Sequence, residues 1–495
     1  MLNVSKDTIL IPTPKKATDK GEKIALAPHI CCERKEWKEL ISVFCDCAEK
    51  IQGLTFTEGA GGVELCFDDR LKRESYTLET YASEEGNCVR VSAPDYQGAA
   101  YGLASVLQLL DRECYIEGWQ IEDWSDKEYS GVMVDLARKW HPFATLLHYV
   151  DLCFFYKVKC LHLHFMDDQS YTLPSAKFPK LSLPGRSYKA EEIETLRAYA
   201  EARGVTLIPE IEMPGHAKVL TQSYPEWFSN TWDDTLEKNS EGKTITENGV
   251  EIRAESIICA GSEKTFTGIQ TLIDEVLELF PDSPYIHLGA DEVNHHVWES
   301  CSCCAAYMKE HDIQDTEELY ADFLGRATDY VLQKGRTPIV WEGFASEHAH
   351  RISKDVIVIG WENHYQTADT LLKNGFRVIN CAWKPLYIVG NVNTYKIDRF
   401  NFEDILNWNV HEWQHFWEQS AAYPDPIRVE PTDRVLGAQI CIWGTTYEQE
   451  ISRAVENIGA MSERVWNTTP ISDNDCILNH MQKVVFDTFR LIAER

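Results

Sequence analysis

The sequence predicts an α/β protein in which a (β/α)8 TIM barrel follows a small α+β domain. From about residue 129, apolar and β-branched runs alternate eight times with amphipathic helical segments. The preceding segment instead has short alternating strands and one apolar helix. The 495 residues exceed one ordinary domain, and a barrel takes about 250. We therefore assign residues 1–125 to the small domain, and 126–495 to the barrel with a C-terminal helical segment.

The small domain is expected to pack its strands against a helix. Apolar and polar residues alternate in Val63–Phe67, Tyr76–Tyr81 and Cys88–Ser92, as in half-buried strands. Gly98–Leu110 has apolar residues at helical spacing. This part of the sequence contains no recognisable catalytic group of residues.

Eight apolar runs are the candidate barrel strands. They are Gly131–Asp135, Cys160–Phe165, Val205–Ile211, Tyr285–Leu288, Pro338–Trp341, Val356–Trp361, Arg377–Cys381 and Leu436–Trp443. Barrel enzymes carry their chemistry at the C-terminal ends of such strands. Acids, imidazoles and indoles follow these runs and are predicted to share one cleft.

Composition excludes several partners. The formal net charge of −30 argues against nucleic acid and anionic membrane surfaces. No apolar run is long enough for a membrane-spanning helix. The N-terminal residues do not resemble a secretory signal, and the 16 cysteines form no disulfide-like pattern. We therefore expect a cytoplasmic protein with reduced thiols, and composition leaves its oligomeric state open.

The sequence is organised around the adjacent acids Asp291 and Glu292. They follow the fourth strand directly, after the small residues Gly289 and Ala290. Neighbours within a strand point to opposite faces, so both acids can face one ligand only if the backbone turns there. Two carboxyl groups in one partly buried cleft have divergent pKa values, so one can hold a proton while the other is charged.

Four motifs resemble glycoside hydrolase family 20, the β-N-acetylhexosaminidases. Val134–Arg138 reads VDLAR, and His162–Gln169 reads HLHFMDDQ. Pro209–His216 reads PEIEMPGH, with Glu212 in place of the family's Asp, and His287–Glu292 reads HLGADE, with Ala290 in place of its second Gly. The resemblance covers most of the chain and implies the two-domain fold expected above.

The resemblance also implies retaining, substrate-assisted hydrolysis of a terminal N-acetylhexosamine, whether GlcNAc or GalNAc, from a glycan or glycoconjugate. The substrate's acetamido oxygen would attack C1 to form an oxazolinium ion. Glu292 would be the general acid and then the base, with a pKa raised toward neutrality. Asp291 would orient the acetamido group and stabilise its developing charge. No cofactor and no metal are implied.

The resemblance assigns substrate-binding roles to seven further residues. Tyr387 would donate to the acetamido oxygen, and Arg138 would bind the sugar's O3 and O4. Asp167 and His216 would hold Glu292 in position. An apolar box around the sugar would be formed by Trp341, Trp361 and Trp443.

Two further positions depart from the family pattern. Val389 stands where an Asp is expected, and Thr445 stands where a Glu is expected. Both acids would recognise O4 and O6. One hypothesis is that the terminal sugar carries an O6 substituent, anionic in one version, with Lys384 as a counter-charge.

Alternative interpretations concern histidines and cysteines. His162 and His164 could ligate the metal of a metal-dependent hydrolase; we favour a hydrogen-bonded role, with one facing the barrel core and the other the helix layer. A second alternative to the hexosaminidase is a catalytically silent sugar-binding protein on the same fold. Cys301, Cys303 and Cys304 lack a partner pair at zinc-finger spacing, so we expect reduced thiols in a helix-capping loop, with zinc as the less favoured alternative.

Overall fold

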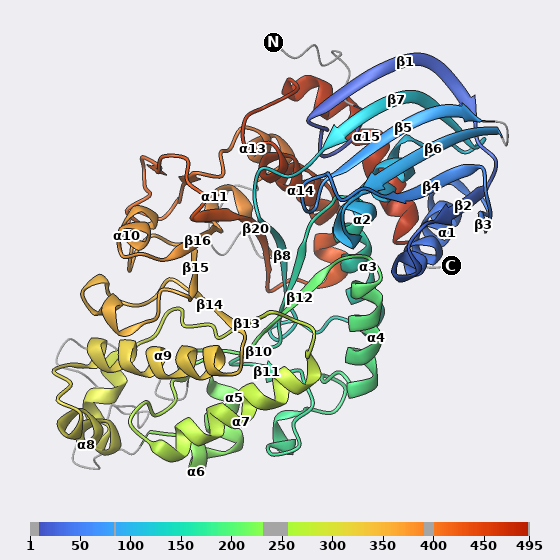
Figure 1. The fold of residues 1–495 in the computed structure, drawn as a ribbon. Helices are drawn as coiled ribbons and strands as arrows, with labels where there is room; N and C mark the ends of the chain where they lie inside the picture. The colour runs from blue at the N-terminus through green and yellow to red at the C-terminus, as the bar shows by residue number, and fades with distance from the viewer. Residues whose placement is uncertain (1–8, 84–85, 231–255, 391–399, 494–495) are drawn as a thin grey trace.

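Eight parallel strands form a closed barrel in the computed structural model, which describes residues 9–83, 86–230, 256–390 and 400–493 (Figure 1). Each strand pairs with the next along the chain, and β20 pairs with both β16 and β8, which closes the sheet. All eight predicted strands are confirmed, with ends shifted by one or two residues. They are β8 (Tyr129–Asp135), β9 (Cys160–His164), β12 (Thr206–Glu210), β13 (Tyr285–His287), β14 (Thr337–Trp341), β15 (Ile357–Gly360), β16 (Arg377–Asn380) and β20 (Val435–Trp443).

Helices cover the outside of the barrel between most strands. The longer ones are α3 (Phe143–Phe155), α4 (Ala190–Glu201), α7 (Glu263–Leu279), α8 (Ser302–Glu310), α9 (Thr316–Gln333), α14 (Tyr447–Trp466) and α15 (Asn474–Leu491). Shorter ones are α5 (Lys218–Ser223), α6 (Pro225–Phe228), α10 (Ala368–Lys373), α11 (Trp383–Leu386) and α13 (Phe402–Leu406). An additional strand, β17 (Tyr387–Val389), pairs with the end of β20.

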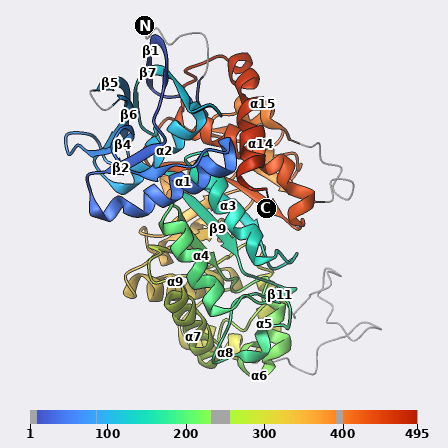
Figure 2. The ribbon, with the colours of Figure 1, turned by 90° about the vertical axis from the view of Figure 1, so that its right-hand side faces the viewer.

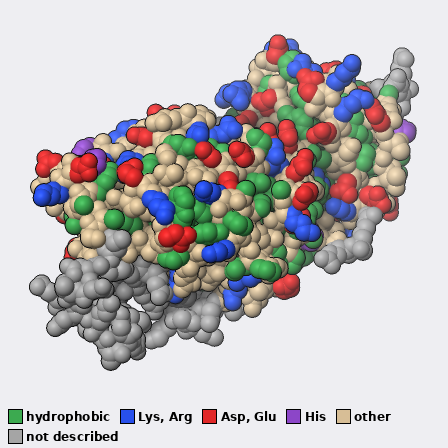
Figure 3. Space-filling view, turned by 90° about the horizontal axis from the view of Figure 1, so that it is seen from below, with side chains coloured by type: hydrophobic (Ala, Val, Ile, Leu, Met, Phe, Trp, Pro, Cys, Tyr) green, Lys and Arg blue, Asp and Glu red, His purple; other side chains and the backbone are tan. Residues whose placement is uncertain are grey.

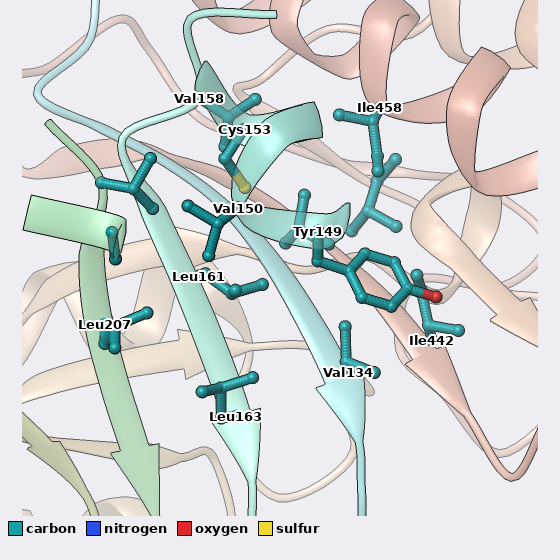
Figure 4. Packing of buried hydrophobic residues seen from close by; sticks show 14 of the residues in the cluster. Val134, Tyr149, Val150, Cys153, Val158, Leu161, Leu163, Leu207, Ile442 and Ile458 are labelled. Carbon is teal, nitrogen blue, oxygen red and sulfur yellow. The ribbon is translucent and has the colours of Figure 1, made fainter. Parts of the chain in front are cut away.

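The two faces of β9 have different partners. Leu161 and Leu163 pack against the helix layer, where Tyr149 and Val150 of α3 lie (Figure 4). His162 and His164 lie on the opposite face, inside the barrel, and both contact Glu210. The expectation that the two histidines face different layers is therefore wrong, because residues two apart in a strand share a face.

The small domain is one mixed seven-stranded sheet with helices on one face (Figures 1 and 2). The strand order is β1-β7-β5-β6-β4-β2-β3. Its elements are β1 (Lys16–Ala25), β2 (His29–Cys32), α1 (Lys38–Gln52), β3 (Thr57–Glu58), β4 (Gly62–Phe67), β5 (Tyr76–Ser83), β6 (Gly86–Ala93), α2 (Tyr96–Leu109) and β7 (Tyr115–Asp123). The three predicted strands and the helix are confirmed. The largely exposed β1 has no apolar alternation by which sequence reasoning could find it.

The two parts of the chain share a buried interface. Helix α2 packs on α3, and α1 packs on the C-terminal α15. Within the interface, the fully buried Lys157 Nζ lies 3.1 Å from Asp123 Oδ2 and donates to the Tyr76 hydroxyl at 2.9 Å. The core is therefore continuous from the small domain into the barrel's helix layer.

The surface mixes charges of both signs. On the face in Figure 3, acidic and basic side chains are interspersed with apolar ones. Among the described residues, no helix is long and apolar enough to cross a membrane.

Candidate active site

A sharp backbone turn after β13 brings Asp291 and Glu292 to the mouth of the barrel. Gly289, Ala290 and Glu292 have φ values of 70°, 80° and 48°. A side chain on Gly289 would meet the Glu212 carboxyl, with Oε2 only 1.6 Å from the Cβ position. The Tyr320 hydroxyl donates to the Ala290 carbonyl and holds the turn from α9.

The two acids have different surroundings. Asp291 is buried, with 7% of its surface exposed, whereas 52% of the Glu292 side chain is exposed. Asp291 Oδ1 is buried without a hydrogen-bond partner in the described part of the chain. Such an acceptor is free to receive an N–H from a ligand.

His216 joins this pair to a second acid. Its Nε2 lies 3.1 Å from Glu292 Oε2 and 3.7 Å from Asp291 Oδ2. On the other side of the ring, Nδ1 lies 3.5 Å from Asp167 Oδ1. Like Glu292, His216 has a left-handed backbone, with φ of 49°. These contacts connect Asp167 to Glu292 through the His216 ring.

The pKa of Glu292 shifts in the direction opposite to the one predicted from the sequence. The hydrogen bond from His216 lowers the pKa of Glu292, although burial opposes it. Burial raises the pKa of Asp291; His216 counters this and the Glu292 charge adds to it. The prediction of a raised Glu292 pKa is thus wrong for the ligand-free site, because an imidazole contacts the half-exposed carboxylate directly.

The opposite pKa shifts of His216 and Glu292 favour His216 as the holder of the shared proton. Burial disfavours the imidazolium, but the nearby carboxylates, led by Asp291 and Asp167, raise its pKa well above the ordinary value. The adjoining Asp167 has its pKa lowered by His164, His216 and Arg138, against the effect of burial. The directions of these shifts favour a charged Glu292 beside a protonated His216 in the ligand-free site.

Arg138 is fixed between two acids and an indole. Its Nη2 lies 2.7 Å from Asp167 Oδ2, and its Nη1 lies 3.4 Å from Asp135 Oδ2. The guanidinium carbon is 4.7 Å from the Trp443 ring centroid. Asp135 Oδ2 also accepts from the Gly444 amide at 3.0 Å. The guanidinium side chain retains partial exposure, so it can bind a ligand from a fixed position.

Four aromatic residues gather where β14, β15 and β20 end and where β17 begins. The Trp341 ring centroid is 6.3 Å from that of Trp361 and 5.9 Å from that of Trp443. Tyr387 stacks on Trp361 with an interplanar angle of 11° and a centroid distance of 6.3 Å. The structure thus brings together the three indoles that the sequence placed in a box and adds Tyr387, the predicted donor to the acetamido oxygen, as a fourth aromatic wall.

A buried network inside the barrel supports this layer. Trp341 Nε1 donates to Glu210 Oε1 at 2.7 Å. Three imidazoles also approach the Glu210 carboxylate: His164 at 2.5 Å, His287 at 2.8 Å and His162 at 3.1 Å. Burial opposes ionisation of Glu210, but the imidazoles lower its pKa well below the usual value. Donor atoms of His162, Glu210 and His287 are close enough to hold a metal, yet the carboxylate already has four partners.

Val389 and Thr445, the two departures expected to affect sugar recognition, lie beside the box. Val389 pairs with Trp443 between β17 and β20 and is buried. Thr445 is buried with its hydroxyl unpartnered among the described residues. The predicted counter-charge, Lys384, lies in α11, where its backbone N–H donates to the Gln414 carbonyl.

Two acids contact this region without a role assigned from sequence. Glu212 is fully buried; burial and then the neighbouring Asp291 raise its pKa well above the usual value. Burial, followed by the charges of Glu292 and Asp291, raises the pKa of Glu362 to about 8. Glu362 directly follows Trp361 at a strand end, and this position could have identified it from the sequence as a residue of the site.

Comparisons with known proteins agree with this arrangement. Residues 128–469 match the model of the glycosyl hydrolase family 20 catalytic domain, and residues 7–124 match domain 2 of the same family. A Beta-hexosaminidase from Porphyromonas gingivalis is 25% identical over 506 residues, covering 94% of this chain and 61% of the relative. One from Vibrio furnissii is 27% identical over 78% of this chain and 63% of its own length. The chain thus spans less than two thirds of either relative.

A solved structure has the same fold. The family 20 exo β-N-acetylglucosaminidase from Vibrio harveyi, in complex with N-acetylglucosamine, superposes with a TM-score of 0.80 and 21% identity, covering 100% of this chain and 80% of that one. The catalytic-domain model spans well over half of the residues and includes Arg138, the acid pair and the aromatic box. The chain therefore belongs to glycosyl hydrolase family 20.

Proposed function

We propose that the protein is a retaining exo-β-N-acetylhexosaminidase that uses the substrate's own acetamido group as nucleophile. The observation that carries the proposal is Asp291 Oδ1, which is buried without a hydrogen-bond partner among the described residues, in a carboxylate that lies beside Glu292 and whose charge reaches Tyr387. An N-acetylated sugar would satisfy that oxygen with its N–H and bury its methyl against the indoles. In family 20 the substrate replaces the nucleophilic carboxylate of other retaining glycosidases.

The first chemical step would form an oxazolinium ion. The acetamido oxygen bonds to C1 as the C1–O bond to the leaving group breaks, and the leaving oxygen takes a proton from Glu292. Asp291 would stabilise the positive charge that develops on the acetamido group. In the second step water adds to C1, Glu292 takes its proton, and the acetamido group is restored with retained configuration.

His216 would supply the proton that Glu292 needs. In the ligand-free site the proton resides on the imidazole, 3.1 Å from the carboxylate. A bound sugar would exclude water from the half-exposed Glu292 and so favour its neutral form. The proton would then cross the existing contact from His216 Nε2 to Glu292 Oε2.

Two matched substrates test the role of the acetamido group. We expect release of chromophore from an aryl N-acetyl-β-glucosaminide and a loss of several orders of magnitude on the corresponding β-glucoside. Equal rates would contradict substrate assistance and favour a metal-dependent hydrolase. If neither substrate releases chromophore but the protein still binds the sugar, a catalytically silent binding protein would be favoured.

Matched variants test the acids. Asp291→Asn should lower kcat by about 10²–10³-fold, the loss expected when one preorganised charge contact is removed. Glu299→Gln changes an exposed acid in the same segment and should keep wild-type rates. Wild-type activity in Asp291→Asn would contradict the assignment.

Val389 and Thr445 are the residues from which we infer a feature of the terminal sugar. We propose that the apolar Val389 and the uncharged Thr445 accommodate an O6 substituent, because neither side chain carries the negative charge with which a carboxylate would repel an anionic substituent. Kinetics with plain and 6-O-sulfated aryl N-acetylglucosaminides test this proposal. A higher kcat/KM for the plain sugar would contradict it.

A further inference from the structure

Three cysteines from two separate segments meet in one buried cluster. Cys259 precedes α7, Cys301 is the residue directly before α8, and Cys304 lies in the first turn of α8. Cys259 Sγ lies 3.6 Å from Cys301 Sγ and 3.7 Å from Cys304 Sγ. All three side chains are buried, and their sulfur atoms all lie within 4.8 Å of one another. Sequence spacing missed this cluster because Cys259 is 42 residues from Cys301.

The sulfur–sulfur distances suit metal coordination. A disulfide would require about 2.05 Å. Four sulfurs at about 2.3 Å from a tetrahedral Zn²⁺ are separated by about 3.8 Å along each edge, which is close to both measured distances. Cys301 and Cys304 are three residues apart at the start of a helix, so they lie on the same side of its first turn. The cluster therefore has the shape of one face of a tetrahedral site.

Backbone packing at the cluster is close. A side chain on Gly261 would place its Cβ 2.6 Å from the Cys304 Cα and 2.8 Å from the Cys303 carbonyl oxygen. Only glycine permits the segment after Cys259 to approach α8 this closely. The two segments are thus brought together by backbone contact as well as by their sulfur atoms.

These segments carry the central groups of the candidate site. Cys259 lies in the connection after β12, which also contains His216, and Cys301 lies in the connection after β13, which contains Glu292. Hydrogen bonds already join the two connections: Trp298 Nε1 donates to the Ile258 carbonyl at 2.9 Å, and the Ile258 amide donates to the Pro214 carbonyl at 3.0 Å. A ligand shared by the three cysteines would tie together the loops that set the contact between His216 and Glu292.

We propose that Cys259, Cys301 and Cys304 bind a structural Zn²⁺ ion that cross-links the loops after β12 and β13. Thiolate ligands select thiophilic ions such as Zn²⁺ over Mg²⁺ or Ca²⁺. Three cysteines leave one coordination position for a further ligand. Binding would release the thiol protons, so its affinity increases with pH.

Metal analysis of the full chain tests the proposal. The protein is purified under reducing conditions, dialysed against dilute Zn²⁺ and then against metal-free buffer, and analysed by elemental mass spectrometry. We expect one zinc per chain in the wild type and a loss of it in Cys259→Ser. Cys303→Ser is the matched control, because this neighbouring thiol lies outside the cluster; it should retain the metal.

A second measurement covers the case in which Cys259→Ser does not fold. Wild-type protein loaded with Co²⁺ should show the strong visible absorption of tetrahedral thiolate coordination, and a mercurial reagent that titrates thiols should abolish it. Three outcomes would overturn the proposal: a wild type without stoichiometric metal, a folded Cys259→Ser that keeps its metal, or a disulfide within the cluster detected by peptide mass mapping of protein purified without reductant.

Discussion

At the residue scale, two of the groups assigned to chemistry, His216 and Glu292, are among the residues other than glycine that have a left-handed backbone. His216, Ala290, Glu292 and Asn363 all have φ between 48° and 80°, a region that residues other than glycine rarely adopt. Such conformations cost about 1–3 kcal/mol each and persist where the surroundings enforce them. For Glu292 the enforced backbone directs the carboxylate toward His216 rather than along the direction of β13.

The proton shared by His216 and Glu292 leads to a pH prediction. Glu292 can act as an acid as long as one proton remains on His216 or on Glu292. Activity should therefore fall at high pH when His216 loses that proton, so the basic limb of the kcat/KM profile should follow the raised pKa of His216. In His216→Gln, Glu292 must hold the proton alone. We therefore expect the basic limb to move to lower pH, with a lower kcat, in kinetic profiles on the aryl substrate.

The control for this prediction is His296→Gln. His296 is exposed and contacts Glu299 in the segment that follows the acid pair. Its substitution should leave the pH profile unchanged. A basic limb that stays in place or moves to higher pH in His216→Gln would contradict storage of the proton on His216.

At the element scale, the turn after β13 depends on a missing side chain. Gly289 and Gly335 have similar φ values, 70° and 74°. A Cβ on Gly335 meets nothing within 4 Å, whereas one on Gly289 would overlap the Glu212 carboxyl. Alanine substitutions at Gly289 and Gly335 should therefore share the cost of backbone strain, and only the one at Gly289 should add a steric overlap.

The expected outcome differs between the two alanine variants. Gly335→Ala should cost about 1–2 kcal/mol of unfolding free energy from strain alone and keep kcat. Gly289→Ala should cost more, because Glu212 must move, and should lower kcat by displacing Asp291. Urea denaturation and steady-state kinetics measure both effects. Equal unfolding free energies and equal kcat would show that the overlap does not matter.

At the scale of the whole molecule, a buried ion pair joins the small domain to the barrel. Lys157 follows α3, and Asp123 ends β7; both side chains are fully buried. Asp123 also accepts from Tyr76 and from Trp466 Nε1, which comes from α14. One carboxylate thus binds elements of both parts of the chain.

Removing the cation should destabilise the whole chain. Lys157→Met leaves Asp123 charged and buried without its counter-ion, which should cost about 3 kcal/mol or more in unfolding free energy. The control is Lys16→Ala, which breaks a half-exposed pair with Glu122 and should cost about 1 kcal/mol or less. Equal costs in urea denaturation would show that the interface pair contributes no more than a surface pair.

The sequence by itself determined the barrel strands, the acid pair and the aromatic residues at the strand ends. These depend on local rules: apolar runs form buried strands, and residues that follow parallel strands meet at one end of the barrel. Sequence reasoning was least effective for β1, whose exposed faces carry no apolar pattern.

Only the tertiary structure decided where the protons lie and which distant residues meet. The pKa values of Glu292 and His216 depend on their mutual contact and on burial, neither of which spacing along the chain contains. The encounter of Cys259 with Cys301 likewise depends on how two loops pack. Local pattern predicts elements because secondary structure is a short-range property, whereas site chemistry depends on distances between segments that only the folded chain brings together.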